Sequence, residues 1–301
     1  MNNVYRLGAV STAFVMATLS MVPATAQTAD TLEDHRPVVS PDGRSLAFMS
    51  NRSGVWAVYL MPLDGSRPAQ RVSSDPLGEW YPDWSPDGRT LVYHRNDRER
   101  GVSYLLTFRI ATREETPLGA TDARRDYARW SPDGKTLYYM CRGTGVCAIS
   151  ADGREQGVAF GLNANQGDPA VSSDGRWIAY VDPMPDKSED IFIRPVNGSE
   201  PIRVTSDPGR SYGLDWSPDG RFLAYNTTIG DNLDVYIYEM ATRRQRRITT
   251  HAATDHMPRW LPDGSGLLFT SERSGHERIY RINADGSGLR LIDTRGIDRP
   301  R

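Results

Sequence analysis

Short apolar runs separated by polar turns recur along the chain from about residue 34 onward. The clearest run is an apolar pair followed by an aromatic residue, and it occurs six times: Leu46–Phe48, Leu91–Tyr93, Leu137–Tyr139, Ile178–Tyr180, Leu223–Tyr225 and Leu267–Phe269. Short runs bounded by Gly, Pro, Asn and Asp are typical of strands. Beyond the first thirty residues no segment of ten or more residues shows a helical period. We therefore expect an all-β protein.

A Ser-Pro-Asp-Gly tetrapeptide precedes each of these runs and divides the chain into six units. It or a near copy stands at Ser40–Gly43, Ser85–Gly88, Ser131–Gly134, Ser172–Gly175, Ser217–Gly220 and Leu261–Gly264, at spacings of 45, 46, 41, 45 and 44 residues. Pro fixes φ at the second position of a type I turn, Asp suits the third, and Gly provides a positive φ at the fourth. The motif therefore predicts a β-hairpin turn in every unit.

Two further runs complete each unit. The third run, such as Val58–Leu60, often ends in an Asp-Gly or Asn-Gly turn, and the fourth is short, as in Arg71–Ser73. Four-stranded units repeated around an axis form a β-propeller. We predict a six-bladed β-propeller of four-stranded antiparallel blades over residues 34–298. Two stacked β-sandwiches are the alternative, but they would not require six near-identical turns.

The first 26 residues have the pattern of a secretory signal peptide. Arg6 precedes an apolar stretch from Leu7 to Val22, and Ala24-Thr25-Ala26 supplies the small residues of a cleavage site. We expect a Sec-type signal peptide over residues 1–26, cleavage after Ala26, a short linker over residues 27–33 and a periplasmic or secreted protein. An uncleaved membrane anchor is the alternative. Ser and Thr residues dilute the apolar stretch, so we expect no integral membrane span in the mature chain.

The charge balance narrows the range of partners. The chain has 36 Lys and Arg residues against 38 Asp and Glu residues, for a formal net charge of −2. This balance excludes the strongly basic face that nucleic-acid binding usually needs, so we expect no nucleic-acid partner. The sequence also holds no P-loop, H-E-x-x-H pair, dinucleotide fingerprint or EF-hand loop. We therefore expect no cofactor.

The two cysteines enclose a turn with two glycines between strand-like runs. Cys141 and Cys147 are six positions apart. In an oxidising compartment a cross-strand disulfide is favoured over two free thiols. Two thiols without a nearby His make a poor zinc site. We expect a Cys141–Cys147 disulfide that staples this hairpin.

The repeat Pro-x-Trp-Ser-Pro-Asp-Gly-(Arg/Lys)-x-Leu-Ala-(Phe/Tyr) resembles that of the TolB-like β-propeller family. Similar repeats also form the N-terminal propellers of prolyl-oligopeptidase-type enzymes. The resemblance covers residues 34 to 296. It implies the propeller fold more specifically than a function, because the motif residues build blades. Full-length members of the family also carry an α/β domain before the propeller, by which they dock to their partners.

Gly209-Arg210-Ser211-Tyr212-Gly213 matches the G-x-S-x-G pattern of serine hydrolases. In those enzymes the Ser lies between a strand and a helix. Here a hairpin turn begins six residues after Ser211. We therefore predict no catalytic role for Ser211 and assign no catalytic residue elsewhere.

The residues just before each innermost strand are better candidates, because in a propeller they meet around one mouth of the central channel. Three positions before the Pro stand Asp34, Glu79, Arg125, Gln166, Ser211 and Asp255, and the next position holds His35, Trp80, Asp126, Gly167, Tyr212 and His256. The first and sixth units share the pattern Asp-His-x-Pro, and ring closure makes them neighbours.

Carboxylates beside imidazoles and aromatic rings suit a cation, a sugar or a basic peptide. The alternative is that these residues only solvate the channel mouth. Our candidate ligand-binding set is Asp34, His35, Glu79, Trp80, Asp126, Tyr212, Asp255 and His256, with no bound metal expected.

These observations favour an exported, non-enzymatic scaffold that binds a protein or peptide partner. A carbohydrate-active or other periplasmic enzyme, acting at the Asp/His-lined mouth of the channel, is the alternative.

Overall fold

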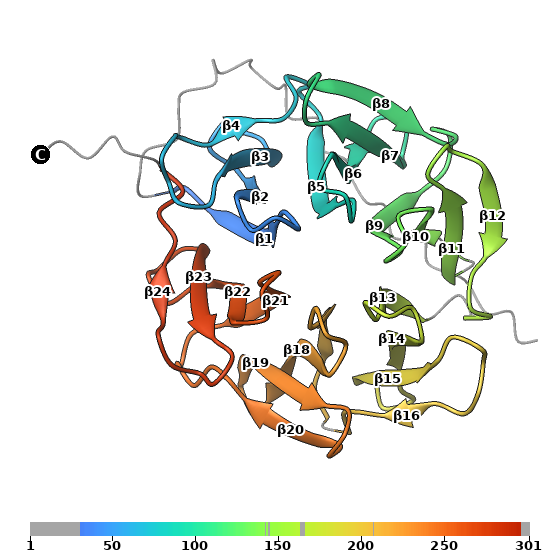
Figure 1. Ribbon diagram of the computed structural model, residues 1–301, viewed down its shortest axis with the longest axis vertical. Helices are drawn as coiled ribbons and strands as arrows, with labels where there is room; N and C mark the ends of the chain where they lie inside the picture. The colour runs from blue at the N-terminus through green and yellow to red at the C-terminus, as the bar shows by residue number, and fades with distance from the viewer. Residues whose placement is uncertain (1–30, 142, 144, 163–165, 207, 296–301) are drawn as a thin grey trace, which may run out of the picture.

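The computed structural model describes residues 31–295 apart from 142, 144, 163–165 and 207. The expected signal peptide and residues 27–30 of the linker lie outside the described residues. Over the described part of the chain, 24 strands form six four-stranded antiparallel sheets, which are arranged as blades around a central axis (Figure 1). The predicted six-bladed propeller is confirmed.

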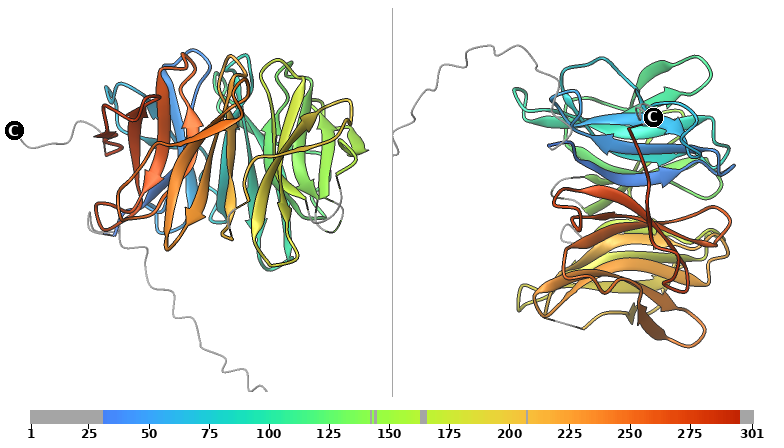
Figure 2. Two further views of the ribbon diagram at one scale, coloured as in Figure 1. Left: turned by 90° about the horizontal axis from the view of Figure 1, so that it is seen from below. Right: turned by 90° about the vertical axis from the view of Figure 1, so that its left-hand side faces the viewer.

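Each blade consists of four strands that are consecutive in sequence, and the first of the four is the innermost (Figure 1). Blades 1 to 3 comprise β1 (Asp34–Val39), β2 (Ser45–Ser50), β3 (Ala57–Pro62), β4 (Gln70–Arg71), β5 (Gly78–Trp84), β6 (Thr90–Asp97), β7 (Val102–Arg109), β8 (Glu114–Leu118), β9 (Arg125–Trp130), β10 (Thr136–Cys141), β11 (Gly145–Ser150) and β12 (Glu155–Val158). Blades 4 to 6 comprise β13 (Gly167–Val171), β14 (Trp177–Pro183), β15 (Glu189–Pro195), β16 (Ile202–Arg203), β17 (Ser211–Trp216), β18 (Phe222–Ile229), β19 (Asn232–Glu239), β20 (Arg244–Arg247), β21 (Asp255–Trp260), β22 (Gly266–Ser271), β23 (Arg278–Asn283) and β24 (Arg290–Leu291). The strands run roughly along the axis, so their turns lie at the two faces of the ring (Figure 2).

The Ser-Pro-Asp-Gly motif closes each inner hairpin through its own hydrogen bonds. In blade 1 the Ser40 hydroxyl donates to Asp42 (2.5 Å), and the Gly43 N–H donates to the carbonyl of Ser40 (2.8 Å). Gly43 has a φ of 73°, a conformation that glycine adopts without a steric penalty. The sixth copy lacks the serine, and there the Ser265 hydroxyl donates to Asp263 instead (2.7 Å). The motif is therefore explained by turn structure.

The hydrophobic core of the described chain is divided into six clusters, each between two adjacent blades. Val58 of blade 1, for example, belongs to one cluster with Leu91 of blade 2. Phe48 of blade 1 shares another with Leu268 of blade 6. The ring is thus held together by the side-to-side packing of neighbouring blades. In the part of the chain that the structure covers, no helix is long and apolar enough to cross a membrane.

Cys141 and Cys147, which we expected to pair, form a disulfide between β10 and β11. Their Cα atoms are 5.8 Å apart. The bond lies beside the connection between β10 and β11, at the closed end of this hairpin of blade 3.

The ring closes through contacts between β1 and the end of blade 6. The N–H of Asp34 donates to the carbonyl of Glu277 (3.0 Å), and the Thr294 hydroxyl donates to the Asp34 carboxylate. Arg52 binds both the carboxylate of Asp34 (2.8 Å) and the carbonyl of Thr294 (3.0 Å). The last blade is therefore fastened to the first by hydrogen bonds and an ion pair, while each sheet keeps its own four strands.

The same contacts join blades 1 and 2. The N–H of Glu79 donates to the carbonyl of Trp56 (3.0 Å), and the Glu79 carboxylate accepts a hydrogen bond from the Ser73 hydroxyl. Closure of the ring therefore repeats an ordinary contact between neighbouring blades.

We expect Thr294→Val to lower the free energy of unfolding by about 1–3 kcal/mol, because the buried Asp34 carboxylate loses a hydrogen bond while the volume is kept. Urea denaturation measures the loss. Thr242→Val is the matched control, since Thr242 is exposed and its hydroxyl donates to Glu239 at the surface. Equal unfolding midpoints for the two variants would contradict the closure role of Thr294.

Candidate functional site

Every innermost strand carries a β-bulge where it borders the channel. The pairing register shifts in all six inner strand pairs. One residue of each bulge has a left-handed backbone with φ between 47° and 74°: Arg36, Tyr81, Tyr127, Asp168, Gly213 and Met257. We call these six residues the channel ring. Five of them are not glycine, and a positive φ in such residues is strain that the surrounding structure must hold.

The residue after the ring position is Pro in four of the blades. These residues are Pro37, Pro82, Pro169 and Pro258. Pro has no N–H, so within sheets it is tolerated at bulges, where ladder pairing is interrupted. The repeated Pro of the sequence motif therefore marks the bulge.

The N–H of four ring residues donates to a second-strand side chain of the preceding blade. The pairs are Arg36 with Thr270 Oγ1 (3.2 Å), Tyr81 with Met49 Sδ (3.3 Å), Tyr127 with His94 Nδ1 (3.4 Å) and Met257 with Asn226 Oδ1 (3.0 Å). All four acceptors occupy one position of the repeat, directly after the aromatic residue of the second strand. Blade 4 has Val181 at that position, whose side chain cannot accept a hydrogen bond. There the carboxylate of Asp168 accepts the hydrogen bond from the Gly213 N–H instead (2.6 Å).

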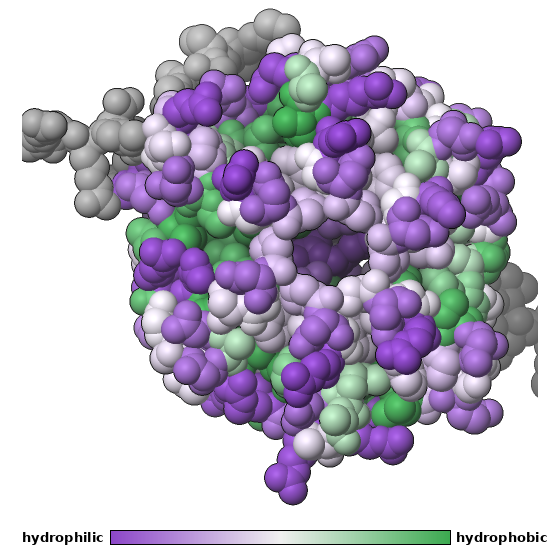
Figure 3. Space-filling view, in the orientation of Figure 1, coloured by the Kyte–Doolittle hydropathy of each residue, from purple (hydrophilic) through white to green (hydrophobic). Residues whose placement is uncertain are grey.

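Five ring side chains line a cavity of about 320 Å³ at one mouth of the channel. They are Arg36, Tyr81, Tyr127, Asp168 and Met257. Tyr212 contributes to the same lining, as do Glu189 and Arg210, which form an ion pair of 2.7 Å. Viewed down the axis, the molecule is hollowed at its centre, and the residues deep in the opening are hydrophilic (Figure 3).

Toward the Ser-Pro-Asp-Gly turns, an Arg–Asp network crosses the channel. Arg129 of blade 3 reaches Asp215 of blade 5 (3.3 Å), and Arg259 of blade 6 binds the same carboxylate (3.0 Å). Burial raises the pKa of Asp83 to about 6 and that of Asp215 to about 7, with Arg129 opposing both shifts. A second cavity of about 340 Å³ lies on this side and is rimmed by Pro41 and three equivalent prolines of the turns.

Three of the predicted ligand-binding residues lie inside the blades and not at the channel mouth. The side chains of Asp34, Glu79 and Asp255 are 0% exposed. Each carboxylate is paired with an arginine: Asp34 with Arg52 (2.8 Å), Glu79 with Arg95 (2.9 Å) and Asp255 with Arg273 (2.7 Å). A buried carboxylate needs such a partner, so we assign these three residues to the architecture of the blades.

His35 and His256 are brought together at the junction of blades 1 and 6. Both face Glu277, at 3.8 Å from His35 Nδ1 and 3.1 Å from His256 Nε2. Burial lowers the pKa of His35 to about 3. The pKa of Glu277 is lowered. Burial acts to raise it, but the hydrogen bond with His256 and the charges of His35, His256 and Arg36 outweigh burial.

Two tryptophans extend this group along the rim. Trp56 contacts the ring of His35 edge to face, with 4.6 Å between centroids, and lies 5.9 Å from Trp80. We call His35, Trp56, Trp80, His256 and Glu277 the rim cluster. Trp56 and Glu277 come from the loops between second and third strands, where each stands two residues after an Arg-Ser-Gly that both loops contain. Sequence reasoning missed both residues.

The remaining candidates lie beside the channel ring. Asp126 is 3.5 Å from His94 Nε2, and Tyr212 lines the cavity. Ser211 is buried in β17, where its hydroxyl shares a hydrogen bond with that of Thr227 (2.7 Å). Across residues 31–295, within the described positions, no group of three or more His, Cys, Asp or Glu side chains is arranged to hold a metal ion.

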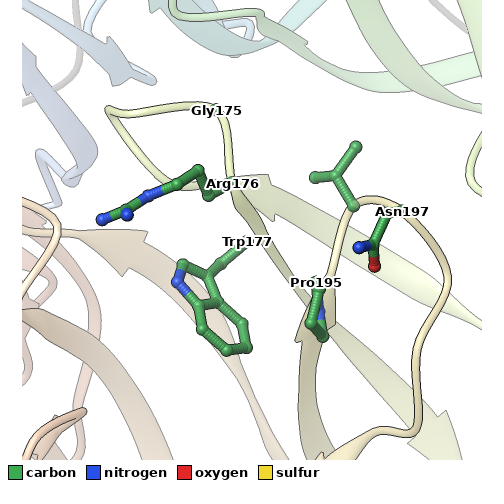
Figure 4. Close-up of a pocket in the computed structure, with 6 residues that line it drawn as sticks. Gly175, Arg176, Trp177, Pro195 and Asn197 are labelled. Carbon is green, nitrogen blue, oxygen red and sulfur yellow. The ribbon is translucent and has the colours of Figure 1, made fainter.

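A separate hollow of about 520 Å³ lies at the turn end of blade 4. Trp177 and Pro195, which are paired across β14 and β15, flank it (Figure 4). Arg176 at its edge is exposed and pairs with Asp174 (2.7 Å). With its charged residue already paired, this hollow offers less chemistry than the cavity in the channel.

Gly213→Ala is expected to lower the free energy of unfolding by at least about 2 kcal/mol, because a left-handed backbone and a steric clash act together. The added Cβ would lie 2.3 Å from Asn226 Oδ1, the atom that binds the N–H of Met257. Gly264→Ala is the control: its φ is +69°, but the added Cβ meets no described atom within 4 Å. Chemical denaturation giving equal losses for the two variants would contradict a tightly held ring.

The pH dependence of stability tests the role of His94. Its Nδ1 accepts the N–H of Tyr127, and burial, followed by the charge of Arg36, lowers its pKa from 6.5 to about 3. Between these pH values His94 is protonated in the unfolded chain and neutral in the folded chain. The free energy of unfolding therefore falls as the pH drops from about 6.5 toward 3, by at most about 1.4 kcal/mol per pH unit.

We expect His94→Asn to make this slope shallower, because Asn keeps an acceptor, as Asn226 does in blade 5, without titrating. Urea denaturation between pH 7.5 and 4.5 measures the slope. His251→Asn, at an exposed histidine, is the control. A slope for His94→Asn as steep as that of the unmodified protein would refute this role.

Comparison with known proteins identifies the family. The PD40 family, described as the TolB beta propeller domain, matches residues 8–170 and 146–300. An uncharacterised protein of Agrobacterium fabrum is 30% identical over 125 residues, which are 42% of each chain. The Tol-Pal system protein TolB of Francisella tularensis subsp. mediasiatica is 33% identical over 79 residues, which are 26% of this chain and 18% of that protein. The match spans less than half the length of either relative.

Solved structures share the fold at lower identity. TolB from Acinetobacter baumannii superposes with a TM-score of 0.65 at 20% identity, over 76% of this chain and 57% of that chain. An oligogalacturonate lyase in complex with manganese has a TM-score of 0.59 at 17% identity, over 86% of this chain and 78% of that chain. At such identities the likeness concerns the fold alone. From its repeats, its six blades and the family match along nearly its whole length, the chain belongs to the TolB beta-propeller (PD40) family.

Proposed function

We propose that this propeller is an exported, non-enzymatic protein that binds an extended segment of a protein partner in the channel-mouth cavity. The observation that carries the proposal is the channel ring. Its bulges direct a guanidinium, two phenols, a carboxylate and a thioether into one cavity of about 320 Å³. Left-handed strain in non-glycine residues costs free energy, and it clusters where side chains must be positioned for a ligand.

The size and lining of the cavity suit a short peptide stretch. Pockets for small ligands span roughly 300–1,000 Å³, so this cavity admits one or two side chains and not a folded domain. Tyr127, which is 38% exposed, and Tyr212 offer large aromatic contact surfaces. Met140 and Met257 add flexible thioethers that adapt to the shape of a bound side chain.

The disulfide of blade 3 and the relationship to TolB support a location outside the cytoplasm, since disulfides persist in oxidising compartments. We infer that residues 1–26 direct export to the periplasm or the medium and are removed after Ala26.

A second function, that of a carbohydrate-active or other periplasmic enzyme, is favoured by the rim cluster. There Trp56 and Trp80 present indole rings beside two histidines that face Glu277. Turnover of a polysaccharide by the unmodified protein, lost in His256→Ala, would support this function over the first.

A displayed library of random peptides tests the binding function directly. We expect specific peptides to be enriched on the secreted protein and to bind with a Kd that isothermal titration calorimetry can measure. Tyr127→Ala should weaken binding about 10-fold or more, because truncation of an aromatic anchor removes a large contact.

Val158→Ala is the matched control, since Val158 is 50% exposed on the outermost strand of blade 3. A library that yields no specific peptide, or peptides whose Kd is unchanged by Tyr127→Ala, would contradict the proposed function.

A further inference from the structure

We propose that Arg36 is the anchor of a carboxylate-binding site in the channel-mouth cavity. The ligand is a carboxylate carried by the inserted segment, either an acidic side chain or a free C-terminus. This inference rests on the proposed function and names the chemical group that the cavity selects.

Arg36 is held in place before any ligand arrives. Its φ is 53°, and its N–H donates to the Thr270 hydroxyl of blade 6 (3.2 Å). The guanidinium lies over the ring of Tyr81, with Cζ 3.2 Å from the ring centroid, and Nη2 donates to the Tyr81 hydroxyl. A cation fixed in this way loses little conformational freedom when it binds an anion.

The guanidinium of Arg36 lacks a counter-ion within the described residues. The other arginines at the channel meet carboxylates: Arg129 and Arg259 bind Asp215, and Arg210 binds Glu189. For Arg36, no such ion pair forms with any residue that the structure describes, and its Nε is buried without a hydrogen-bond partner. A buried charge without a partner is costly, and a bound anion would offset that cost.

Tyr81 and Asp168, which both act electrostatically on Arg36, do not neutralise this charge. Burial raises the pKa of Tyr81, so its phenol stays neutral. Asp168 stands across the ring in blade 4, where its carboxylate accepts the N–H groups of Gly213 (2.6 Å) and Leu214 (3.2 Å). It also lies 3.8 Å from Arg129 of blade 3, so the charge of Asp168 already interacts with blades 3 and 5.

The charge distribution of the cavity favours one carboxylate over a phosphate. A planar guanidinium matches the two oxygens of a carboxylate. A phosphate dianion would meet a single unpaired cation and would be repelled by Asp168 and Glu189, which line the same space. Tyr127, Tyr212 and Met257 surround the remaining volume, so the carboxylate should be borne next to a large apolar group.

N-acetyl-L-phenylalanine and its C-terminal amide are matched probes, since they differ only in the carboxylate. We expect the acid to bind the full-length protein at millimolar or lower concentration and the amide to bind at least about 10-fold more weakly. Arg36→Gln should weaken binding of the acid by about 10- to 100-fold, the range for a hydrogen bond to a charged group. Arg176→Gln, at an exposed arginine outside this cavity that is paired with Asp174, should change it less than about 3-fold.

Peptides from the displayed library distinguish the source of the carboxylate. Each is compared as the free acid, as the C-terminal amide and with its Asp and Glu residues replaced by Asn and Gln. Weakening by amidation alone identifies a C-terminus, and weakening by side-chain replacement alone identifies an acidic residue; both support the site.

The site is overturned if the acid does not bind, if acid and amide bind equally, or if Arg36→Gln leaves binding of the acid unchanged. Peptides that bind the cavity regardless of Arg36→Gln would keep the proposed function and remove this site. If the acid binds through Arg36 but no peptide binds, the carboxylate site is kept and the proposed peptide-binding function is removed.

Unfolding of the ligand-free variant separates a binding role from an architectural one. Removing an unpaired buried cation should leave the urea midpoint of Arg36→Gln equal to or higher than that of the unmodified protein. A clear drop would mean that Arg36 serves the fold, and would also overturn the site.

Discussion

The hydrogen bond from a left-handed bulge to a side chain of the preceding blade is the contact on which the channel depends. It satisfies an N–H that the bulge removes from the strand ladder, and leaving such a group buried and unpaired costs about 1–3 kcal/mol. It also fastens each innermost strand to its neighbour, because Thr270 binds Arg36 across the closure of the ring and His94 binds Tyr127 between blades 2 and 3. The direction of the side chains in the cavity therefore follows from contacts between blades.

The fold could be predicted from the sequence because its signals are local. A Ser hydroxyl and an Asp carboxylate two residues apart, followed by a Gly with positive φ, specify the same turn wherever they occur, as Ser40, Asp42 and Gly43 illustrate. Six such turns at one period leave little choice of architecture. The family followed from the same residues.

The candidate site could be predicted only in part. Sequence reasoning placed its candidates at the end of the innermost strands where the cavity lies, and it expected His35 and His256 to be neighbours. It chose residues one and two positions before the ring. Asp34 and Glu79 are consequently buried against arginines, while Arg36 and Tyr81 point into the cavity. The bulge changes which side chains along the strand point toward the channel. The side chains that accept hydrogen bonds from the bulge lie in another blade, so the strand's own sequence does not reveal it. Ring residues also differ from blade to blade, so no repeat reveals them.

The channel wall beyond the ring does repeat, with a period of three blades. Asp83 and Asp215 stand at equivalent positions, and each accepts the N–H of the tryptophan in the next blade, Trp130 (2.9 Å) and Trp260 (2.7 Å). The same order recurs in the indoles, since Trp84 donates to the carbonyl of Val38 (3.1 Å) and Trp216 to that of Ala170 (2.9 Å). A pattern that satisfies backbone groups in the same way in both halves of the ring is what an architectural role requires.

The channel ring abandons this symmetry two residues away in the same strands. A period of three would place the same residue type in blades that are three apart. The ring residues of such blades differ: they are Arg36 and Asp168, Tyr81 and Gly213, and Tyr127 and Met257. All six blades have the bulge, so the left-handed backbone does not result from one unusual residue. A uniform bulge that carries mostly different side chains therefore makes an asymmetric cavity, in which the cation of Arg36 and the carboxylate of Asp168 lie on opposite sides of the channel. An asymmetric lining can impose a single orientation on a ligand, which a symmetric ring around the same axis could not do.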